Sequence, residues 1–116
     1  MDEEIKKSLF DIKTSIESIH DFLGENRNFE QFCSQKVVKR AVEREFEIIG
    51  EALNRVLKID DTISITDARK IVNLRNYIIH AYDNVVAEIL WGIIVKHLPT
   101  LEEEIKSLLP DEDEKM

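Results

Sequence analysis

Hydrophobic residues recur at steps of three and four along most of the chain, a spacing that places them on one side of an α-helix. The first such stretch runs from about Asp2 to Leu23 and is followed by Gly24, a common helix stop. Its apolar stripe comprises Ile5, Leu9, Ile12, Ile16, Ile19 and Leu23. His20 neighbours the stripe, so we expect a surface or boundary histidine rather than a metal ligand.

A second long helix is predicted after a short helical turn around Phe29 and Phe32. It begins at a Ser34 cap and runs to about Lys58. Its inward stripe is predicted to comprise Val38, Ala41, Val42, Glu45, Ile48, Ile49, Ala52, Leu53 and Val56. Gly50 lies inside this helix, where glycine costs about 1 kcal/mol relative to alanine. We therefore expect Gly50 to pack closely against another helix.

Three glutamates of this second helix leave two interpretations open. Glu45 interrupts the apolar stripe, and Glu47 and Glu51 lie one turn apart. They are either ordinary helix residues or the support of a polar site on the inner face.

A third helix is predicted from a Thr66 cap to Asp83-Asn84, where it ends or bends. The loop before it, around residues 59–65, breaks the helical period with aspartates and a serine. The inward residues of this helix are predicted to be Ile71, Val72, Leu74, Ile78 and Ile79.

The last periodic stretch is predicted to begin near Val85 and to end before Pro110. Pro99 bends or restarts it, with Thr100 as a second cap. Its inward residues are predicted to be Val86, Ile89, Leu90, Ile93, Ile94, Leu98, Leu101, Ile105 and Leu108.

This series of helices predicts an all-α fold, an antiparallel bundle of four to five helices. With 116 residues and only three glycines and two prolines, the chain has the length of one domain and few signals for the turns of a β-fold. We assign residues 1–110 to a single helical domain and residues 111–116 to an acidic, solvated tail.

Charge and cysteine content narrow the class of protein. The formal net charge is −8, which argues against a stably nucleic-acid-coated protein. However, residues 36–75 carry nine lysines and arginines against seven acidic side chains. The single Cys33 excludes an internal disulfide. The acidic start, Met1 to Glu4, is not the pattern expected of a signal or transit peptide, and no apolar run reaches membrane-spanning length. We expect a cytoplasmic protein without a membrane partner.

Candidate chemistry concentrates in residues 75–82. Arg75 falls in the middle of the apolar arc of the third helix, which is costly unless it is paired or faces a cleft. His80 titrates near neutrality. Arg75 and His80 lie about 140° apart on a straight helix, so they converge only if the helix bends near Asp83 or a second subunit contributes its copy. The alternative is structural: Arg75 pairs with a glutamate of the second helix, and His80 lies at the surface.

The order Arg75-Asn76, then His80 and Tyr82, resembles the Arg-x-x-x-x-His-x-Tyr signature of HepT-like ribonuclease toxins in the HEPN superfamily. Residues 47–52, 89–91 and 98–101 are also similar to segments of that family. The match covers most of the chain, and the order and spacing of the pieces make it more specific than the motif alone.

The resemblance implies a homodimer whose two motifs line one cleft and cut RNA without a metal or another cofactor. RNA supplies its own nucleophile, the 2′-hydroxyl, so DNA should resist cleavage and the product should carry a 2′,3′-cyclic phosphate. In this scheme His80 moves protons, Arg75 holds the phosphate and the charge of the transition state, and Asn76 orients one of them.

The same resemblance assigns Tyr82 to regulation. In such type VII-like toxin–antitoxin systems a minimal nucleotidyltransferase antitoxin transfers AMP from ATP to this tyrosine, with ATP used by the antitoxin. AMP on Tyr82 would place bulk and negative charge beside Arg75. Tyr77 faces elsewhere and is the weaker candidate. A second hypothesis is a non-catalytic helical module that binds a nucleotidyltransferase or a nucleotide, which the acidic charge favours.

Overall fold

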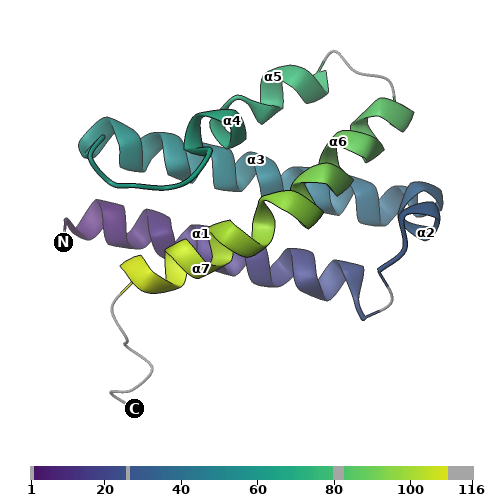
Figure 1. The fold of residues 1–116 in the computed structure, drawn as a ribbon, viewed down its shortest axis with the longest axis horizontal. Helices are drawn as coiled ribbons and strands as arrows, with labels where there is room; N and C mark the ends of the chain where they lie inside the picture. The colour runs from purple at the N-terminus through teal and green to yellow at the C-terminus, as the bar shows by residue number, and fades with distance from the viewer. Residues whose placement is uncertain (1, 26, 80–82, 110–116) are drawn as a thin grey trace.

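Seven α-helices account for most of residues 2–25, 27–79 and 83–109, the part of the chain that the computed structural model describes. This part contains no strand, so the predicted all-α fold is confirmed (Figure 1). The helices are α1 (Glu3–Leu23), α2 (Phe29–Ser34), α3 (Lys36–Ile59), α4 (Ala68–Val72), α5 (Leu74–Ile79), α6 (Asp83–Lys96) and α7 (Leu98–Leu108).

The first helix follows its sequence pattern closely. Asp2 caps α1, because its Oδ1 accepts hydrogen bonds from the backbone N–H groups of Glu4 (2.7 Å) and Ile5 (3.1 Å). Gly24 ends the helix with a φ of 67°, which favours glycine. The predicted stripe is buried from Ile5 to Ile19, and Leu23 is half-buried.

The long helix α3 packs antiparallel to α1 and differs from its prediction in two details (Figure 1). Phe46 is buried and Glu45 only half-buried, so the stripe turns slightly away from the predicted glutamate. The Ser34 cap is also wrong: Gln35 is the N-cap residue, and the Ser34 hydroxyl donates instead to the Gln31 carbonyl (2.8 Å).

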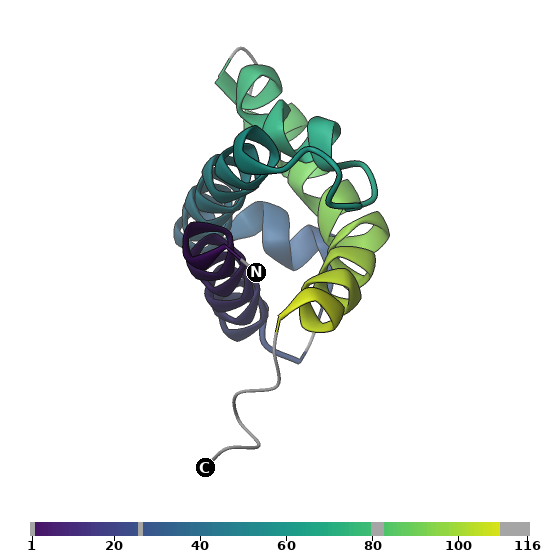
Figure 2. The same ribbon diagram turned by 90° about the vertical axis from the view of Figure 1, so that its left-hand side faces the viewer.

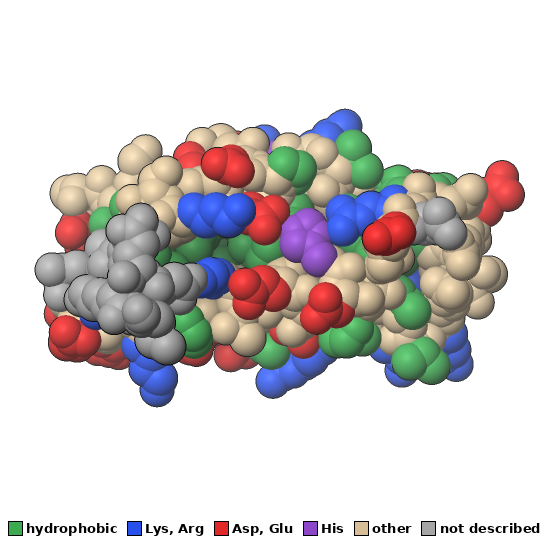
Figure 3. All heavy atoms as spheres, turned by 90° about the horizontal axis from the view of Figure 1, so that it is seen from below, with side chains coloured by type: hydrophobic (Ala, Val, Ile, Leu, Met, Phe, Trp, Pro, Cys, Tyr) green, Lys and Arg blue, Asp and Glu red, His purple; other side chains and the backbone are tan. Residues whose placement is uncertain are grey.

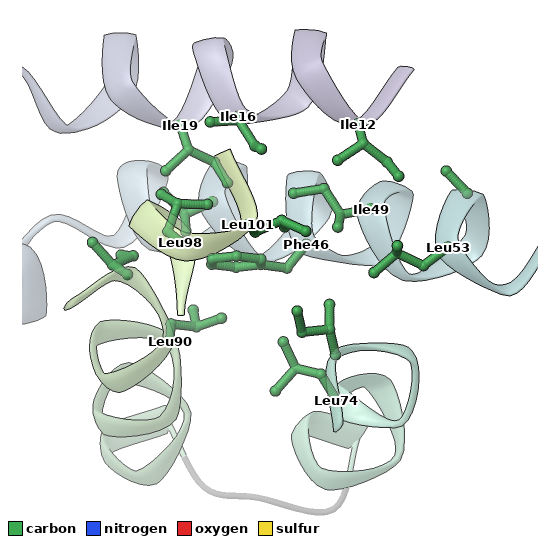
Figure 4. Close-up of a cluster of buried hydrophobic side chains, with 14 of the residues drawn as sticks. Ile12, Ile16, Ile19, Phe46, Ile49, Leu53, Leu74, Leu90, Leu98 and Leu101 are labelled. Carbon is green, nitrogen blue, oxygen red and sulfur yellow. The ribbon is translucent and has the colours of Figure 1, made fainter. Parts of the chain in front are cut away.

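Phe46 lies at the centre of the core. Figure 4 shows its ring among the isoleucines of α1, the leucines of α7, and Leu74 and Leu90 of α5 and α6. The labelled residues around it are Ile12, Ile16, Ile19, Ile49, Leu53, Leu74, Leu90, Leu98 and Leu101. Because all seven helices of the described part contribute to one cluster, α5 is joined to the same core as the two longest helices.

The remaining helices close the bundle on its other side. In Figure 2, seen along the longest axis, α1 and α3 lie opposite α6 and α7, with α4 and α5 above. Pro99 lies in the first turn of α7, where a missing N–H costs no helical hydrogen bond. The second cap at Thr100 is wrong, because α7 already begins at Leu98.

His20 links α1 to α7, as expected of a boundary histidine. Arg27 Nη2 lies 2.7 Å from His20 Nδ1. A guanidinium only donates hydrogen bonds, so Nδ1 accepts and the ring proton is on Nε2, which donates to Glu102 Oε1 (3.1 Å). His20 thus acts as a structural bridge between α1 and α7.

The face over α1 and α7 carries charges of both signs (Figure 3). A shallow groove there is lined by Lys13, Ile16, Glu17, Glu102, Ile105 and Lys106. Alternating charges do not favour a phosphate backbone, so this groove is a poor nucleic-acid path. None of the helices in the described part of the chain has the length and apolarity needed to cross a bilayer.

Candidate active site

The helix predicted from Thr66 onward is broken in two at Asn73. The Asn73 N–H bonds the carbonyls of Arg69 and Ile71, and the Asn76 N–H bonds the Asn73 carbonyl at 3.0 Å, three residues back. These tightened turns end α4 and start α5 as a separate segment. A wheel drawn through one straight helix therefore does not describe residues 71–79.

The short helix α5 is held by two buried side chains, Leu74 and Ile78, spaced four residues apart. Asn76 and Tyr77, between them, are exposed, and the Tyr77 side chain is 64% accessible. Burial on one side therefore presents Asn76 to solvent, where its amide can contact a ligand.

Close contact with α3 fixes the position of α4. A Cβ atom on Gly50 would lie 3.4 Å from the Ile71 carbonyl oxygen and 3.7 Å from that of Val72. This confirms the predicted close packing at Gly50. Figure 1 shows α5 continuing from α4 toward the end of α3 that joins α2. The close approach of the α4 backbone to Gly50 therefore helps to set the direction in which α5 continues from α4.

Polar contacts anchor the loop that enters α4. The predicted Thr66 cap is wrong, because Asp67 is the N-cap residue, and it makes no capping hydrogen bond. Thr66 instead bonds Glu104 of α7, through its backbone N–H to Oε1 (3.0 Å) and its hydroxyl to Oε2 (2.7 Å). Asp67 adopts a φ of 55° and lies 3.1 Å from Nδ1 of His97. The loop is thereby tied to the junction of α6 and α7.

The structure describes the predicted catalytic residues to different extents. Arg75 belongs to α5, but its side chain lies outside the described part of the structure, as do His80 and Tyr82 altogether. Asn76 lies exposed on α5. α6 begins at Asp83, close to the predicted helix start near Val85. Convergence of Arg75 with His80 and the pairing of Arg75 remain predictions.

The glutamates of α3 lie at the rim of the core rather than within it. Glu45 is half-buried, Glu51 is exposed, and Glu47 pairs with Arg44 on the same helix at 3.6 Å. Since the Arg44 side chain is exposed to solvent, the pair adds little stability. These positions do not form an acidic inner site among the described residues.

A row of cations follows the exposed side of α3. Lys36, Arg40 and Arg44 are exposed and recur every four residues, within about 80° of one another on the helix. The row lies in the half of α3 toward which α5 points (Figure 1). In a chain of net charge −8, this is a local surface suited to phosphate groups.

The sequence alone did not indicate the contacts that hold the loop before α4, and with it the segment α4–α5. Thr66, Asp67, His97 and Glu104 lie in three separate stretches of the chain, so no local spacing indicated that they meet. Within the described residues, no group of three or more His, Cys, Asp and Glu side chains could hold a metal ion.

Comparison with known proteins gives consistent results. The family model described as Ribonuclease HepT-like matches residues 12–108. "Putative RNase TTE0752" of Caldanaerobacter subterraneus subsp. tengcongensis is 36% identical over 73% of this chain and 77% of its own length. "Probable ribonuclease HepT" of Thermococcus cleftensis is 33% identical over 89% of this chain and 94% of its own. No solved structure gives a significant match.

Proposed function

The chain belongs to the HepT-like ribonuclease family, and we propose that it is a metal-independent endoribonuclease toxin that cuts RNA through Arg75 and His80. The observation that carries this proposal is the family match over residues 12–108, which contains the whole motif. The fold supports it, because α5 is seated in the core and presents Asn76 to solvent.

The proposed reaction is transesterification by the 2′-hydroxyl of RNA. His80 accepts the hydroxyl proton as the oxygen attacks phosphorus, the bond to the 5′-oxygen breaks, and that oxygen takes up a proton. Arg75 holds the charge on the phosphate oxygens, and Asn76 orients the phosphate or the imidazole. The products are a 2′,3′-cyclic phosphate and a free 5′-hydroxyl. DNA lacks the nucleophile and should not be cut.

We further propose that the protein acts as a homodimer in which two motifs line one cleft. Tyr77 and Val85, on either side of residues 80–82, are 64% and 39% exposed. Apolar side chains this exposed next to the motif support a contact there between two copies. The cationic row on α3, Lys36, Arg40 and Arg44, would bind RNA phosphates that extend away from the cleft.

Regulation is proposed to act on Tyr82. A nucleotidyltransferase antitoxin would add AMP from ATP to its hydroxyl and release pyrophosphate. The added phosphate would compete with RNA for Arg75, and the adenosine would fill the cleft. Protein incubated with the antitoxin and ATP should gain the mass of AMP and lose RNA cleavage, and Tyr82→Phe should escape both effects.

The nuclease proposal is tested with purified protein and RNA in excess EDTA. Cleavage should persist in EDTA, and Arg75→Ala or His80→Ala should abolish it without changing the unfolding transition. Arg69→Ala, an exposed arginine on α4, is the matched control and should cut normally. If both motif variants still cut RNA, the assigned site is wrong.

A second candidate is a non-catalytic module that binds the nucleotidyltransferase. The net charge of −8 favours it, since a strongly acidic chain repels RNA at long range. Tight binding of the nucleotidyltransferase, with no RNA cleavage at any protein concentration, would select this candidate.

A further inference from the structure

A small open pocket lies where the end of α1, the helix α2 and the helix α6 meet. α2 packs on α6 at the end of the bundle where α3 begins (Figure 1). The pocket has a volume of about 200 Å³. Sites for drug-sized ligands typically measure about 300–1,000 Å³, so this pocket suits one planar ring system rather than a whole cofactor.

One wall of the pocket is aromatic. Trp91 of α6 lines it and is half-buried. The indole ring centroid lies 5.3 Å from that of Phe32 and 5.9 Å from that of Phe29, both on α2. These tilted ring contacts, together with the burial of Phe32 in the core, hold the indole in one orientation. A planar ligand that enters the pocket therefore meets a preformed aromatic surface.

Amide groups supply hydrogen-bonding capacity beside this wall. Asn28, Gln31 and Gln35 line the pocket and are exposed. The side chains of Gln31 and Gln35 make no hydrogen bond with another described residue, so their amides are available to a ligand. A glutamine amide carries a donor and an acceptor side by side, which matches the edge of a nucleobase.

The charge around the pocket favours a phosphate-bearing ligand. Arg27 lines it, and its guanidinium is positioned by His20 Nδ1 (2.7 Å) and by the carbonyl of Gly24 (3.4 Å). Among the described residues that line the pocket none is acidic, although the chain has a net charge of −8. The cationic row on α3 begins at Lys36, directly after Gln35. The pocket is thus continuous with a surface suited to phosphate groups.

We propose that this pocket binds one unpaired nucleobase of a single-stranded RNA whose phosphates follow the cationic row on α3. The base packs on Trp91, its edge bonds the amides of Gln31 and Gln35, and Arg27 holds the neighbouring phosphate. Aromatic side chains and edge hydrogen bonds are the usual means by which proteins bind unstacked bases.

This inference rests on the proposed function, because it takes RNA as the ligand. Trp91 lies on the helix that follows the motif, eight residues and about 12 Å along the axis from Asp83. A strand bound at the motif therefore needs only a short extension to reach the pocket.

The fluorescence of Trp91 tests the proposal directly, because this is the only tryptophan of the chain. A 2′-O-methyl oligouridylate, which cannot be cut, should quench it on titration. An abasic strand of the same length carries the same phosphates and should bind about tenfold or more weakly, with little quenching. Absence of quenching by the oligouridylate, or equal quenching by the abasic strand, would overturn the proposal.

Variants of the amide residues give a second test. The double variant Gln31→Ala with Gln35→Ala should bind the oligouridylate about two- to tenfold more weakly, with an unchanged unfolding transition. Thr14→Ala, an exposed position on α1, is the matched control and should bind as wild type does. Wild-type affinity in the double variant would reject the assigned pocket.

Two further measurements separate the possible ligands and the two proposals. Uridine 5′-monophosphate should bind far more weakly than the strand, and equal affinity would assign the pocket to free nucleotides instead of RNA. Quenching by the oligouridylate without cleavage of unmodified RNA would reject the nuclease and support the pocket. Cleavage without quenching would reject the pocket and leave the nuclease in place.

Discussion

The pair α1 and α3 and the segment α4–α5 are stabilised in different ways. The pair consists of helices of 21 and 24 residues joined along continuous apolar stripes. The helices α4 and α5 have five and six residues, too few to be stable alone. They are held by a close backbone approach at Gly50, by Leu74 and Ile78, and by polar contacts to α7.

The comparison shows that the helices that stabilise the fold differ from the segment that carries the candidate site. Long stripes fix the bundle, and most of the described core residues belong to them or to α6 and α7. The segment that carries Arg75 and Asn76 adds little core of its own and depends on contacts from distant parts of the chain. We therefore expect substitutions in the pair to unfold the protein, and substitutions around the segment to alter the site with a smaller loss of stability.

The largest effect is expected from Phe46→Ala. Phe46 is 2% exposed at the centre of the core, and removing a buried phenylalanine side chain costs about 3–5 kcal/mol. Urea unfolding should show this loss in the free energy of unfolding. Phe10→Ala is the matched control, because Phe10 is 55% exposed and its loss should change stability only slightly. Similar losses for the two variants would contradict the core described above.

An intermediate effect is expected from Gly50→Leu. A Cβ alone would meet the α4 backbone at ordinary contact distance, so Gly50→Ala should be tolerated. The larger leucine must displace α4, at a cost of about 1–3 kcal/mol. We expect hydrogen exchange to accelerate in α4 and α5 more than in α1, and RNA cleavage to fall further than stability alone predicts. Uniform acceleration over all helices would show that the segment is not separately held.

A smaller effect is expected from Glu104→Ala. The carboxylate of Glu104 accepts hydrogen bonds from the N–H and the hydroxyl of Thr66, and both donors can turn to water when it is removed. The free energy of unfolding should fall by about 1 kcal/mol. Glu103→Ala, an exposed neighbour, should have no measurable effect. Equal behaviour of the two variants would show that the loop before α4 needs no anchor on α7.

The smallest expected effect concerns the loop between α3 and α4. The hydrogen bond from the Thr62 hydroxyl, followed by that from the Thr62 N–H, lowers the pKa of Asp60 from its usual 3.8. Since the folded pKa lies below the unfolded one, this stabilisation is present above pH 3.8 and is lost as the pH falls through the folded pKa. Thr62→Val should raise the pKa of Asp60 partway, and Thr62→Ser should leave it unchanged, as read by NMR titration of the carboxyl carbon.

The long helices could be predicted from the sequence because each repeats the same spacing of apolar residues, at steps of three and four, over many turns. The stripe of α1 is correct from Ile5 to Ile19, and Asp2 and Gly24 mark its ends. The error in α3 is one of phase: a glutamate at position 45 and a phenylalanine at position 46 compete for the inward side, and the larger apolar residue takes it.

The short helices could not be predicted in the same way. The helix break at Asn73 involves only one or two backbone hydrogen bonds. The spacing of apolar residues along the chain carries no sign of such a local change. The capping hydroxyl expected at Thr66 is used by Glu104, 38 residues away in sequence. Of the candidate site, the motif residues could be named from their order, but the order of residues does not give their mutual geometry.

The packing of α7 against α1 also determines when the bundle can be completed during synthesis. On the ribosome, Ile12 and Ile16 emerge long before Leu101 and Ile105, so the stripe of α1 stays partly uncovered until nearly a hundred residues have been added. A nascent chain of this kind is an incomplete bundle. The cell therefore meets a finished bundle only after α7 has been synthesised.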